Sequence, residues 1–421
     1  MRKLLLKIAQ IIVLLQLPAL VLSALLIGLF RKISKSEDRV VFGGAGLINL
    51  SNWCQALKQN GFCASTKVWG TPTIYPPTTF DFDLQAKYKR ASYIVAPFSF
   101  VQAIRKYNVV VCGFDGFLLG TTFLRKLEPS LLHLANCKII AIPYGGDAYF
   151  YSNMKNESLQ HAIQLSYPYV HKHQIRAKMN VRRMVEKADF LMSGFMNFDG
   201  IGRWDLLAPS SLVINTDIWQ SSKPKHASGK MKVLHTPNHR GFKGTEFIVR
   251  AVDELRKEGL QIELLLVEKQ SNTYVRQLLT TEIDVLIEQL IFPGYAMSAI
   301  EGMSCGAVVI SNLKDERIMQ PMKRWSFLSE CPIVSADPET IKEVLRDLYH
   351  DIGMRRKISL DSRIYALKYH SFKSFAVLFE QILKYLNNER DDLLNYYHPI
   401  IGEYSPQATA KSQNQKSLIN E

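Results

Sequence analysis

The hydrophobic positions of the second half alternate between short apolar runs, typical of buried strands, and the three- and four-residue spacing of helices. The predicted strands cover residues 232–235, 262–267, 285–290 and 307–311, and the predicted helices cover 245–258, 272–280, 296–305 and 338–350. Strands that alternate with helices indicate a parallel sheet with helices on both faces.

The first half shows the same alternation, less regularly. Arg39-Val-Val-Phe-Gly-Gly-Ala-Gly46 predicts a strand that ends in a glycine-rich turn, followed by a helix over 49–58. Further strands are predicted at 65–69, 109–112, 138–143 and 190–193, whereas 70–95, rich in Pro, Thr and Tyr, predicts a long loop. We therefore expect an α/β protein with two Rossmann-like parallel-sheet domains that face a cleft.

Composition changes along the chain divide it into segments. The polar stretch 221–230 predicts an interdomain linker, and 372–388 has helical spacing. The expected segments are an N-terminal membrane anchor and basic linker (1–38), an N-terminal domain (39–217), a C-terminal domain (218–371), a closing helix (372–396) and a disordered tail (397–421).

The N-terminus contains a long apolar run. No charged residue occurs from Ile8 to Phe30, a length that suffices for a helix to cross a bilayer, which takes ~20 residues. Basic residues flank the run on both sides, so the positive-inside rule leaves its orientation open. We expect a retained anchor; a cleaved signal peptide, with a small-residue site at Leu22-Ser-Ala24, or a buried or surface-lying helix are the alternatives.

Charge and cysteine content restrict the partners. The 421 residues carry a formal net charge of +14, which favours anionic partners, and no nucleic-acid-binding motif occurs. We expect membrane lipids and a nucleotide as partners, and no nucleic acid. The six cysteines show no paired spacing, which favours reduced thiols and a cytoplasmic catalytic domain.

A glycine-containing loop before a helix is a candidate phosphate site. Phe292-Pro-Gly294-Tyr295-Ala296 precedes the predicted helix 296–305, which carries the acidic residue Glu301. A helix N-terminus offers free backbone N–H groups and the positive end of the helix dipole to a diphosphate. A carboxylate further along the helix is able to accept hydrogen bonds from ribose hydroxyls. An ordinary loop and helix of an α/β domain is the alternative.

A second cationic segment lies about fifty residues earlier. His235 ends a predicted strand, and Arg240, Lys243, Gly244 and Thr245 lead into the next helix, with Thr245 as the expected N-cap. Lysine beside a glycine at a helix start supplies positive charge to a phosphate.

Together, the two segments resemble the donor-binding domain of bacterial GT-B glycosyltransferases of the large retaining group. The resemblance implies that Lys243 and Arg240 grip the donor diphosphate and that Glu301 is the second glutamate of the family's E-x7-E motif. Pro293 stands where the first glutamate is expected, and Glu288-Gln-Leu290 is similar to an acidic segment of other members. The implied donor-binding residues are His235, Arg240, Lys243, Gly244, Thr245, Glu288, Gly294, Tyr295, Ala296 and Glu301.

The first half is similar to the acceptor domain of the same group. Asp147, after Ile142-Pro-Tyr-Gly-Gly, matches an Asp-containing loop that faces the cleft, and is the implied catalytic residue. A turn-forming or capping Asp is the alternative. The expected acceptor-side glycines are Gly44, Gly46, Gly145 and Gly146.

The resemblance implies a membrane-associated, retaining glycosyltransferase. It would move a sugar from a nucleoside-diphosphate sugar to a lipid-linked or cell-envelope polysaccharide acceptor. We expect neither a cofactor nor a metal, because Lys243 and a helix dipole share the phosphate charge. A non-catalytic GT-B-like binding protein and a nucleotide-sugar epimerase of GT-B architecture are the alternatives.

Overall fold

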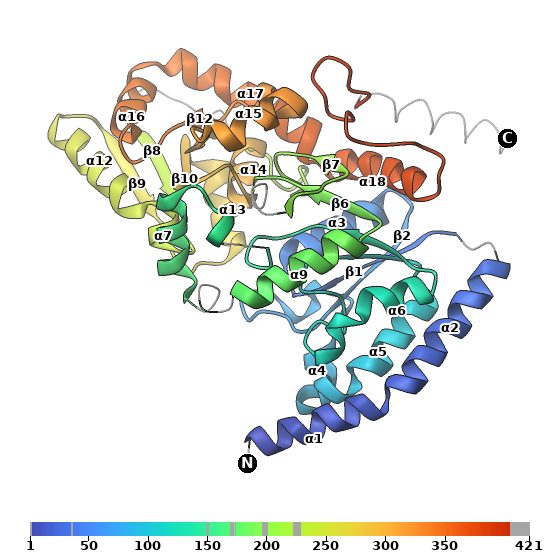
Figure 1. Cartoon of the computed structure of the whole chain (residues 1–421). Helices are drawn as coiled ribbons and strands as arrows, with labels where there is room; N and C mark the ends of the chain where they lie inside the picture. Colours follow the sequence, from blue (N-terminus) through green and yellow to red (C-terminus); the bar gives the residue numbers. More distant parts are fainter. Residues whose placement is uncertain are drawn as a thin grey trace.

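The computed structural model describes residues 2–34, 37–148, 151–168, 172, 174–195, 201–221 and 229–404. Two α/β domains, each built on a parallel sheet, lie against each other, and a pair of apolar helices runs along the edge of the first domain (Figure 1). This arrangement confirms the predicted fold class. Residues 222–228 of the predicted linker and 405–421 of the predicted tail lie outside the described residues.

Within the described residues, the N-terminal domain is built on a seven-stranded parallel sheet of order β3-β2-β1-β4-β5-β6-β7. The interior strand β1 is buried from Val40 to Phe42 because helices cover both faces. The strands are β1 (Arg39–Gly44), β2 (Cys63–Val68), β3 (Phe82–Asp83), β4 (Val109–Cys112), β5 (Lys138–Ala141), β6 (Phe190–Ser193) and β7 (Leu206–Leu207). The helices are α3 (Ile48–Gln59), η1 (Pro77–Thr79), α4 (Leu84–Tyr88), η2 (Lys89–Ala91), α5 (Ser92–Lys106), η3 (Phe123–Lys126), α6 (Glu128–Leu134), η4 (Tyr151–Asn153), α7 (Glu157–Ser166) and α9 (Gln174–Lys187).

The expected long loop over 70–95 is wrong in its second half. This segment contains η1, β3, α4, η2 and the start of α5. The Asp83 carboxylate caps α4 by accepting a hydrogen bond from the Ala86 amide, and Phe100 and Ala103 anchor α5 in the core. Pro97 inside α5 and the proline-rich start of the segment conceal the helical pattern.

The C-terminal domain contains all four predicted strands and all four predicted helices, whereas the helices at 316–325 and 352–370 and the strand at 334–335 were not predicted. Its parallel sheet has the order β12-β11-β10-β8-β9. The strands are β8 (Met231–His235), β9 (Ile262–Leu266), β10 (Val285–Pro293), β11 (Val308–Asn312) and β12 (Val334–Ser335). The helices are α11 (Arg240–Lys243), α12 (Thr245–Lys257), α13 (Asn272–Thr281), α14 (Met297–Ser304), α15 (Glu316–Trp325), η5 (Phe327–Glu330), α16 (Ile341–His350), α17 (Ile352–His370) and α18 (Phe372–Leu386). Strand β10 continues beyond its predicted end at 290 through Pro293, with register shifts against β11 after Ile287.

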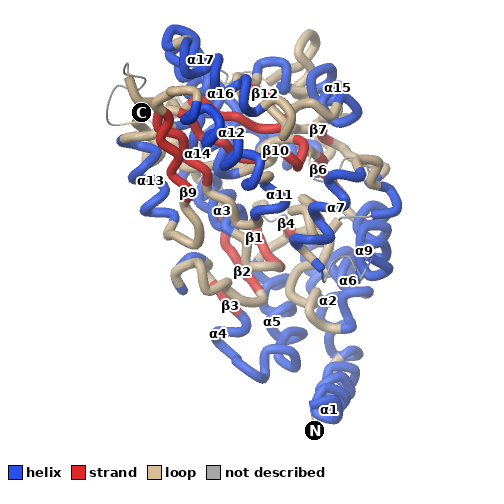
Figure 2. The backbone as a smooth tube through the Cα atoms, turned by 90° about the vertical axis from the view of Figure 1, so that its left-hand side faces the viewer, coloured by secondary structure: helices blue, strands red, loops and turns tan. Residues whose placement is uncertain are grey.

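Two helices, α7 and α18, cross between the domains and hold them together (Figure 1). Figure 2 shows α7 beside α11. The closing helix α18 packs on α3 of the N-terminal domain, where Phe375 stacks on Trp53 with ring centroids 6.0 Å apart. In the opposite direction, α7 packs on α11, and Asn156 donates a hydrogen bond to Asp315 at 3.0 Å. The two domains are thus joined by elements from both halves.

The apolar N-terminal run forms two helices instead of one. Helix α1 (Arg2–Leu15) and helix α2 (Leu17–Ile33) meet at Gln16, and Pro18 lies in the first turn of α2. The stretch Leu4–Ile33 is long and apolar enough to cross a membrane by length and composition. Both helices pack on the N-terminal domain, α1 on α5 and α2 on α5 and α6.

The six cysteines are all free thiols, as their spacing predicts. In the Asp81-Phe-Asp83 sequence, Asp81 forms an ion pair with Lys58 at 3.0 Å. Asp83 accepts hydrogen bonds from the amides of Thr71 and Ala86. Both carboxylates thus have roles in local structure.

Candidate functional site at the domain cleft

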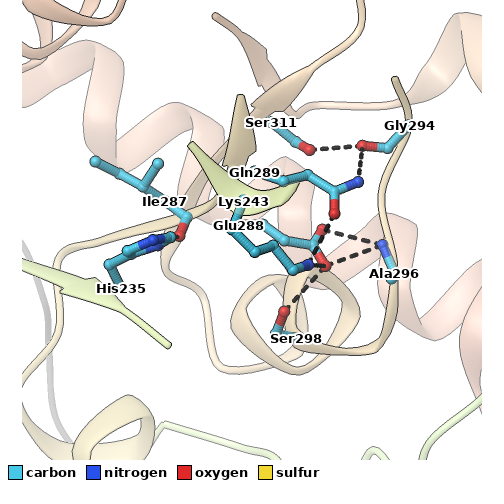
Figure 3. A network of polar contacts seen from close by, with 9 residues as sticks. All are labelled: His235, Lys243, Ile287, Glu288, Gln289, Gly294, Ala296, Ser298 and Ser311. Carbon is cyan, nitrogen blue, oxygen red and sulfur yellow. Dashed lines mark hydrogen bonds and ion pairs between the residues drawn. The ribbon is translucent and has the colours of Figure 1, made fainter. Parts of the chain in front are cut away.

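The loop between β10 and α14 depends on Gly294, which has a φ of +120°. The Gly294 carbonyl accepts hydrogen bonds from Gln289 at 3.0 Å and Ser311 at 2.6 Å (Figure 3). A Cβ at Gly294 would lie 2.6 Å from the ring of Phe195 in the N-terminal domain. Glycine is required here both for the backbone angle and for the close approach of the two domains.

A buried carboxylate accepts hydrogen bonds from the start of α14. Glu288 is buried and accepts hydrogen bonds from the Ala296 amide at 3.0 and 3.1 Å and from the Ser298 hydroxyl at 2.9 Å (Figure 3). The amides of residues 297–299 have no acceptor among the described residues. Such free amides at the positive end of a helix are suited to bind an anion.

Lys243 brings a positive charge to the same turn. Its Nζ donates to the Gln289 amide oxygen at 2.7 Å and lies 3.4 Å from the Glu288 carboxylate. An ammonium has three N–H donors, so one remains for a further acceptor. Lys243, Glu288 and the start of α14 therefore form one cluster (Figure 3).

The predicted N-cap at Thr245 is wrong. Gly244, in the left-handed region with a φ of +74°, ends α11 and caps α12. Thr245 is the first residue of α12, and its buried hydroxyl lies 2.9 Å from His235 Nε2. Glycine between the two helices allows the sharp turn that makes Lys243 the last residue of α11.

His235 and Arg240 have partners within the protein. His235 Nδ1 donates to the Ile287 carbonyl at 2.7 Å, so Nε2 is left to accept from Thr245, and burial lowers the pKa of His235 to about 4. Arg240 forms ion pairs with Glu246 and Glu268 at 2.8 and 3.0 Å. In this geometry both residues position α11 and α12, and their direct contact with a donor stays a prediction.

Glu301 lies in the second turn of α14 and is 7% exposed. Asn272 donates a hydrogen bond to its carboxylate at 3.2 Å. Burial, together with the nearby negative charge of Glu288, raises the pKa of Glu301 to about 8. Because most of its hydrogen-bonding capacity is unused, the carboxyl group is able to bind hydroxyl groups of a ligand.

Tyr295 connects the glycine loop to α17. Its hydroxyl lies 2.8 Å from that of Tyr365 and 3.0 Å from His370 Nε2, and its ring meets Phe195 edge to face. The buried hydroxyl is therefore used inside the protein, and Tyr295 fixes the loop.

Asp147 is buried in the N-terminal domain with three backbone partners. One oxygen accepts from the amides of Tyr144 and Gly145 at 3.0 Å, and the other accepts from Phe114 at 2.8 Å. Burial raises the pKa of Asp147 to about 7. This geometry gives Asp147 a positioning role that joins two loops, and the catalytic role predicted for it stays a prediction.

Of the predicted acceptor-side glycines, two allow close packing. A Cβ at Gly44 or Gly46 would lie 2.6 Å from the Gly116 carbonyl or 2.2 Å from the Gly70 carbonyl. Gly145 has a φ of +121°, whereas Gly146 has open space around it. Close packing of loops therefore explains why glycine occupies positions 44 and 46.

A cavity of about 210 Å³ lies between the domains. Its lining combines the start of α3 and the loops after β5, β6 and β7 with residues 295–297 of the C-terminal domain. Asn49, Tyr144 and Ser193 line it, although they are not among the predicted site residues. Only their position at or after the carboxyl ends of predicted strands pointed to them, because the carboxyl ends of parallel strands form the usual site of α/β folds.

Comparison with protein-family models found no match, and comparison with curated proteins found none either. Among solved structures, the chain is similar to sucrose-phosphate synthase from Thermosynechococcus elongatus, with a TM-score of 0.53 and 12% identity over 84% of this chain and all of that one. It is also similar to Anabaena HepE in complex with UDP-glucose, with a TM-score of 0.52 and 12% identity over 83% of this chain and all of that one. At this identity the likeness shows the fold: the chain has the GT-B architecture of glycosyltransferases.

Proposed function

We propose that this protein is a glycosyltransferase that takes a sugar from a nucleoside-diphosphate sugar. The observation that carries the proposal is the cluster at the cleft. A diphosphate would bind to the three free amides at the start of α14 and to the Lys243 ammonium, and Glu301 follows one turn later. The solved complex of HepE with UDP-glucose, which has the same fold, supports this class of donor.

The chemistry of the step follows from these groups. When the bond between the sugar and the diphosphate breaks, negative charge grows on the leaving phosphate oxygen. Lys243 and the dipole of α14 would stabilise that charge, which is the type of interaction that lowers the barrier most. Glu301 would accept hydrogen bonds from the ribose. Retention of the anomeric configuration is the outcome that the family resemblance implies.

Glu288 sets a condition on this mechanism. Its carboxylate holds the Ala296 amide, so the diphosphate would use the next three amides of the turn. Lys243, whose Nζ lies 3.4 Å from Glu288, would reduce the repulsion between this carboxylate and a bound diphosphate.

For the acceptor, we propose a phosphate-bearing, lipid-linked or cell-envelope glycan at a membrane. A groove of about 480 Å³ is lined by Arg125, Arg176 and Arg183, together with two lysines. Arg183 donates to Asn180, Asn180 donates to Asp115, and Asp115 accepts from the hydroxyl of Tyr144, which lines the cleft. This chain of hydrogen bonds connects the basic groove to the cleft, where an anionic acceptor would be held.

One observation favours a second function, that of a non-catalytic nucleotide- or glycan-binding protein. Pro293, the last residue of β10, occupies the position of the first glutamate of the E-x7-E motif, so no carboxylate is present there. Without that group, contacts to the donor sugar are reduced while those to diphosphate and ribose remain.

Turnover separates the candidates. The purified full chain is incubated with nucleoside-diphosphate sugars, with and without membrane extracts that supply acceptors. A transferase releases the nucleoside diphosphate, faster with acceptor, and Lys243→Ala abolishes the release. Tight nucleotide binding without release of product indicates the binding protein, and a changed donor sugar in the absence of acceptor indicates the epimerase.

A further inference from the structure

Helices α1 and α2 are largely apolar, yet only one side is covered. Nearly half of the exposed large hydrophobic side chains in the described residues lie on these two helices. Leu15, Phe30 and Ile33 are 75, 70 and 87% exposed. A helix on the surface of a water-soluble domain carries polar residues on its outer face, so the outer face of α1 and α2 is suited to a medium other than water.

The inner face is built into the N-terminal domain. Leu20, Ala24 and Gly28, one turn apart on α2, are buried. A Cβ at Gly28 would lie 2.0 Å from the Leu134 carbonyl, so the backbone of α2 contacts α6 directly. At the kink, Gln16 donates to the Ile94 carbonyl of α5 at 3.2 Å.

Arg31 locks the end of α2 in place. Its guanidinium donates to the carbonyls of Ala135 and Tyr107 at 2.9 and 2.7 Å, and also to the carbonyl of Ile104. If α2 left the domain to cross a bilayer, these carbonyls would lose their donor and the core beneath would be exposed. Taken alone, α2 has 17 residues and a length of about 25 Å, less than the ~30 Å of a hydrocarbon core, so a crossing helix would also need residues of α1.

Positive charge borders the apolar face. Lys7 on α1 and Lys32 on α2 are exposed. Beside α2, a groove of about 670 Å³ has Leu26 and Phe30 on one wall and Arg39, Arg105 and Lys106 around it, with one carboxylate, Glu37. Among the described residues, no ion pair involves these five lysine and arginine side chains. An apolar wall beside unpaired cations complements the acyl chains and headgroup phosphates of anionic lipids.

We propose that α1 and α2 form an in-plane membrane anchor, which stays docked on the N-terminal domain and inserts its outer face into one leaflet of an anionic bilayer. The anchor does not cross the membrane. An isolated amphipathic helix has a polar face of its own. In this protein, the N-terminal domain takes the place of that polar face. This inference concerns lipid binding and is independent of the proposed transfer reaction.

Sidedness tests the proposal directly. Lys7→Cys and Lys32→Cys are made separately in a full chain in which the exposed Cys63 is changed to Ser. The Cys63→Ser chain without either new cysteine is the control for background labelling. In sealed membrane vesicles with the catalytic domain outside, a membrane-impermeant maleimide labels both cysteines without detergent if the anchor lies in the plane. Labelling of Lys7→Cys only after detergent, or a mature chain that lacks the segment, overturns the proposal.

Docking is tested with neighbouring residues. Arg31→Gln lowers the melting temperature of the full chain in detergent by several degrees, whereas Lys32→Gln, one residue further and exposed, leaves it unchanged. Equal, negligible effects of both variants overturn the docked arrangement.

Vesicle flotation tests the lipid. The full chain floats with phosphatidylcholine vesicles that contain phosphatidylglycerol and less with phosphatidylcholine alone. Leu26→Glu reduces the bound fraction roughly tenfold, and Leu360→Glu, a comparably exposed leucine of α17, has no effect. A chain that forms dimers and floats with neither vesicle type contradicts the proposal and indicates that a second copy covers the face.

Discussion

Two loops at the carboxyl ends of the parallel strands are each held in place by a buried carboxylate, but the surroundings of the two carboxylates differ. After β10, the buried Glu288 holds the start of α14. After β5, the buried Asp147 holds the turn at Tyr144 and Gly145. The first loop also has Lys243 at 3.4 Å and free helix amides, whereas Asp147 accepts only backbone hydrogen bonds. A buried carboxylate alone organises a loop, and we propose that the added cation and the free amides make the first loop an anion site.

The change of largest expected effect removes that cation. Lys243→Ala takes away the charge that we propose stabilises the leaving diphosphate, so we expect transfer to fall by roughly 100-fold or more. Arg240→Ala, which breaks only exposed ion pairs, serves as the control and changes transfer less. Equal activities of Lys243→Ala and the unmodified chain would remove Lys243 from the mechanism.

Glu301 should have a smaller effect, confined to the ribose. Glu301→Gln replaces one carboxyl oxygen with an amide nitrogen that cannot accept a hydrogen bond, and we expect the Kd of the nucleoside diphosphate to rise about tenfold. A 2′,3′-dideoxy analogue, which lacks both hydroxyls, should bind the two proteins alike in calorimetry. If the variant loses affinity for the analogue to the same extent, Glu301 does not contact the ribose.

Asp147→Asn distinguishes a positioning residue from a catalytic one. The side-chain amide cannot replace all the acceptor contacts, so we expect a loss of about 1–3 kcal/mol in the free energy of unfolding. Nucleotide affinity should remain, and transfer per folded molecule should fall less than in Lys243→Ala. Unchanged stability with a loss of transfer as large as that of Lys243→Ala would make Asp147 catalytic after all.

The smallest effect is on the pH dependence of stability. Burial raises the pKa of Asp147 and Glu128 to about 7 and that of Glu301 to about 8. The folded chain therefore holds protons that the unfolded chain releases near pH 4. Their contribution to stability is complete below about pH 4 and is lost as the pH rises through 7 to 8. Melting temperatures across this range should decline, with a weaker decline in Glu128→Gln; a rise would contradict these shifts.

The C-terminal domain was predictable because its signals are local. Short apolar runs and helical spacing identify β8 and α12, and the glycine loop identifies the start of α14. Helix α17 escaped prediction because its apolar residues do not gather on one face: Leu360, Ile364 and Leu367 are exposed while Tyr365 and Ala366 are buried.

The site was predictable as a set of segments but not as a network. Sequence order suggested Lys243 and Glu301. The contacts of Lys243 with Glu288 and Gln289, however, arise because the short helix α11 packs against β10, which lies over 40 residues later in the sequence. Likewise, the use of both His235 nitrogens is set by Ile287 on the neighbouring strand. The same reasoning applies to Asp147, whose partner Phe114 follows another strand.

Equilibrium binding of nucleotides tests the central claim most directly. The full chain in detergent is titrated with the diphosphates of uridine, guanosine, adenosine and cytidine in a calorimeter, in parallel with Lys243→Ala. We predict that at least one diphosphate binds to one site, more tightly than its monophosphate, and that Lys243→Ala abolishes this preference. Failure of every diphosphate to bind, or binding that Lys243→Ala leaves unchanged, would contradict the assignment of the anion site at α14.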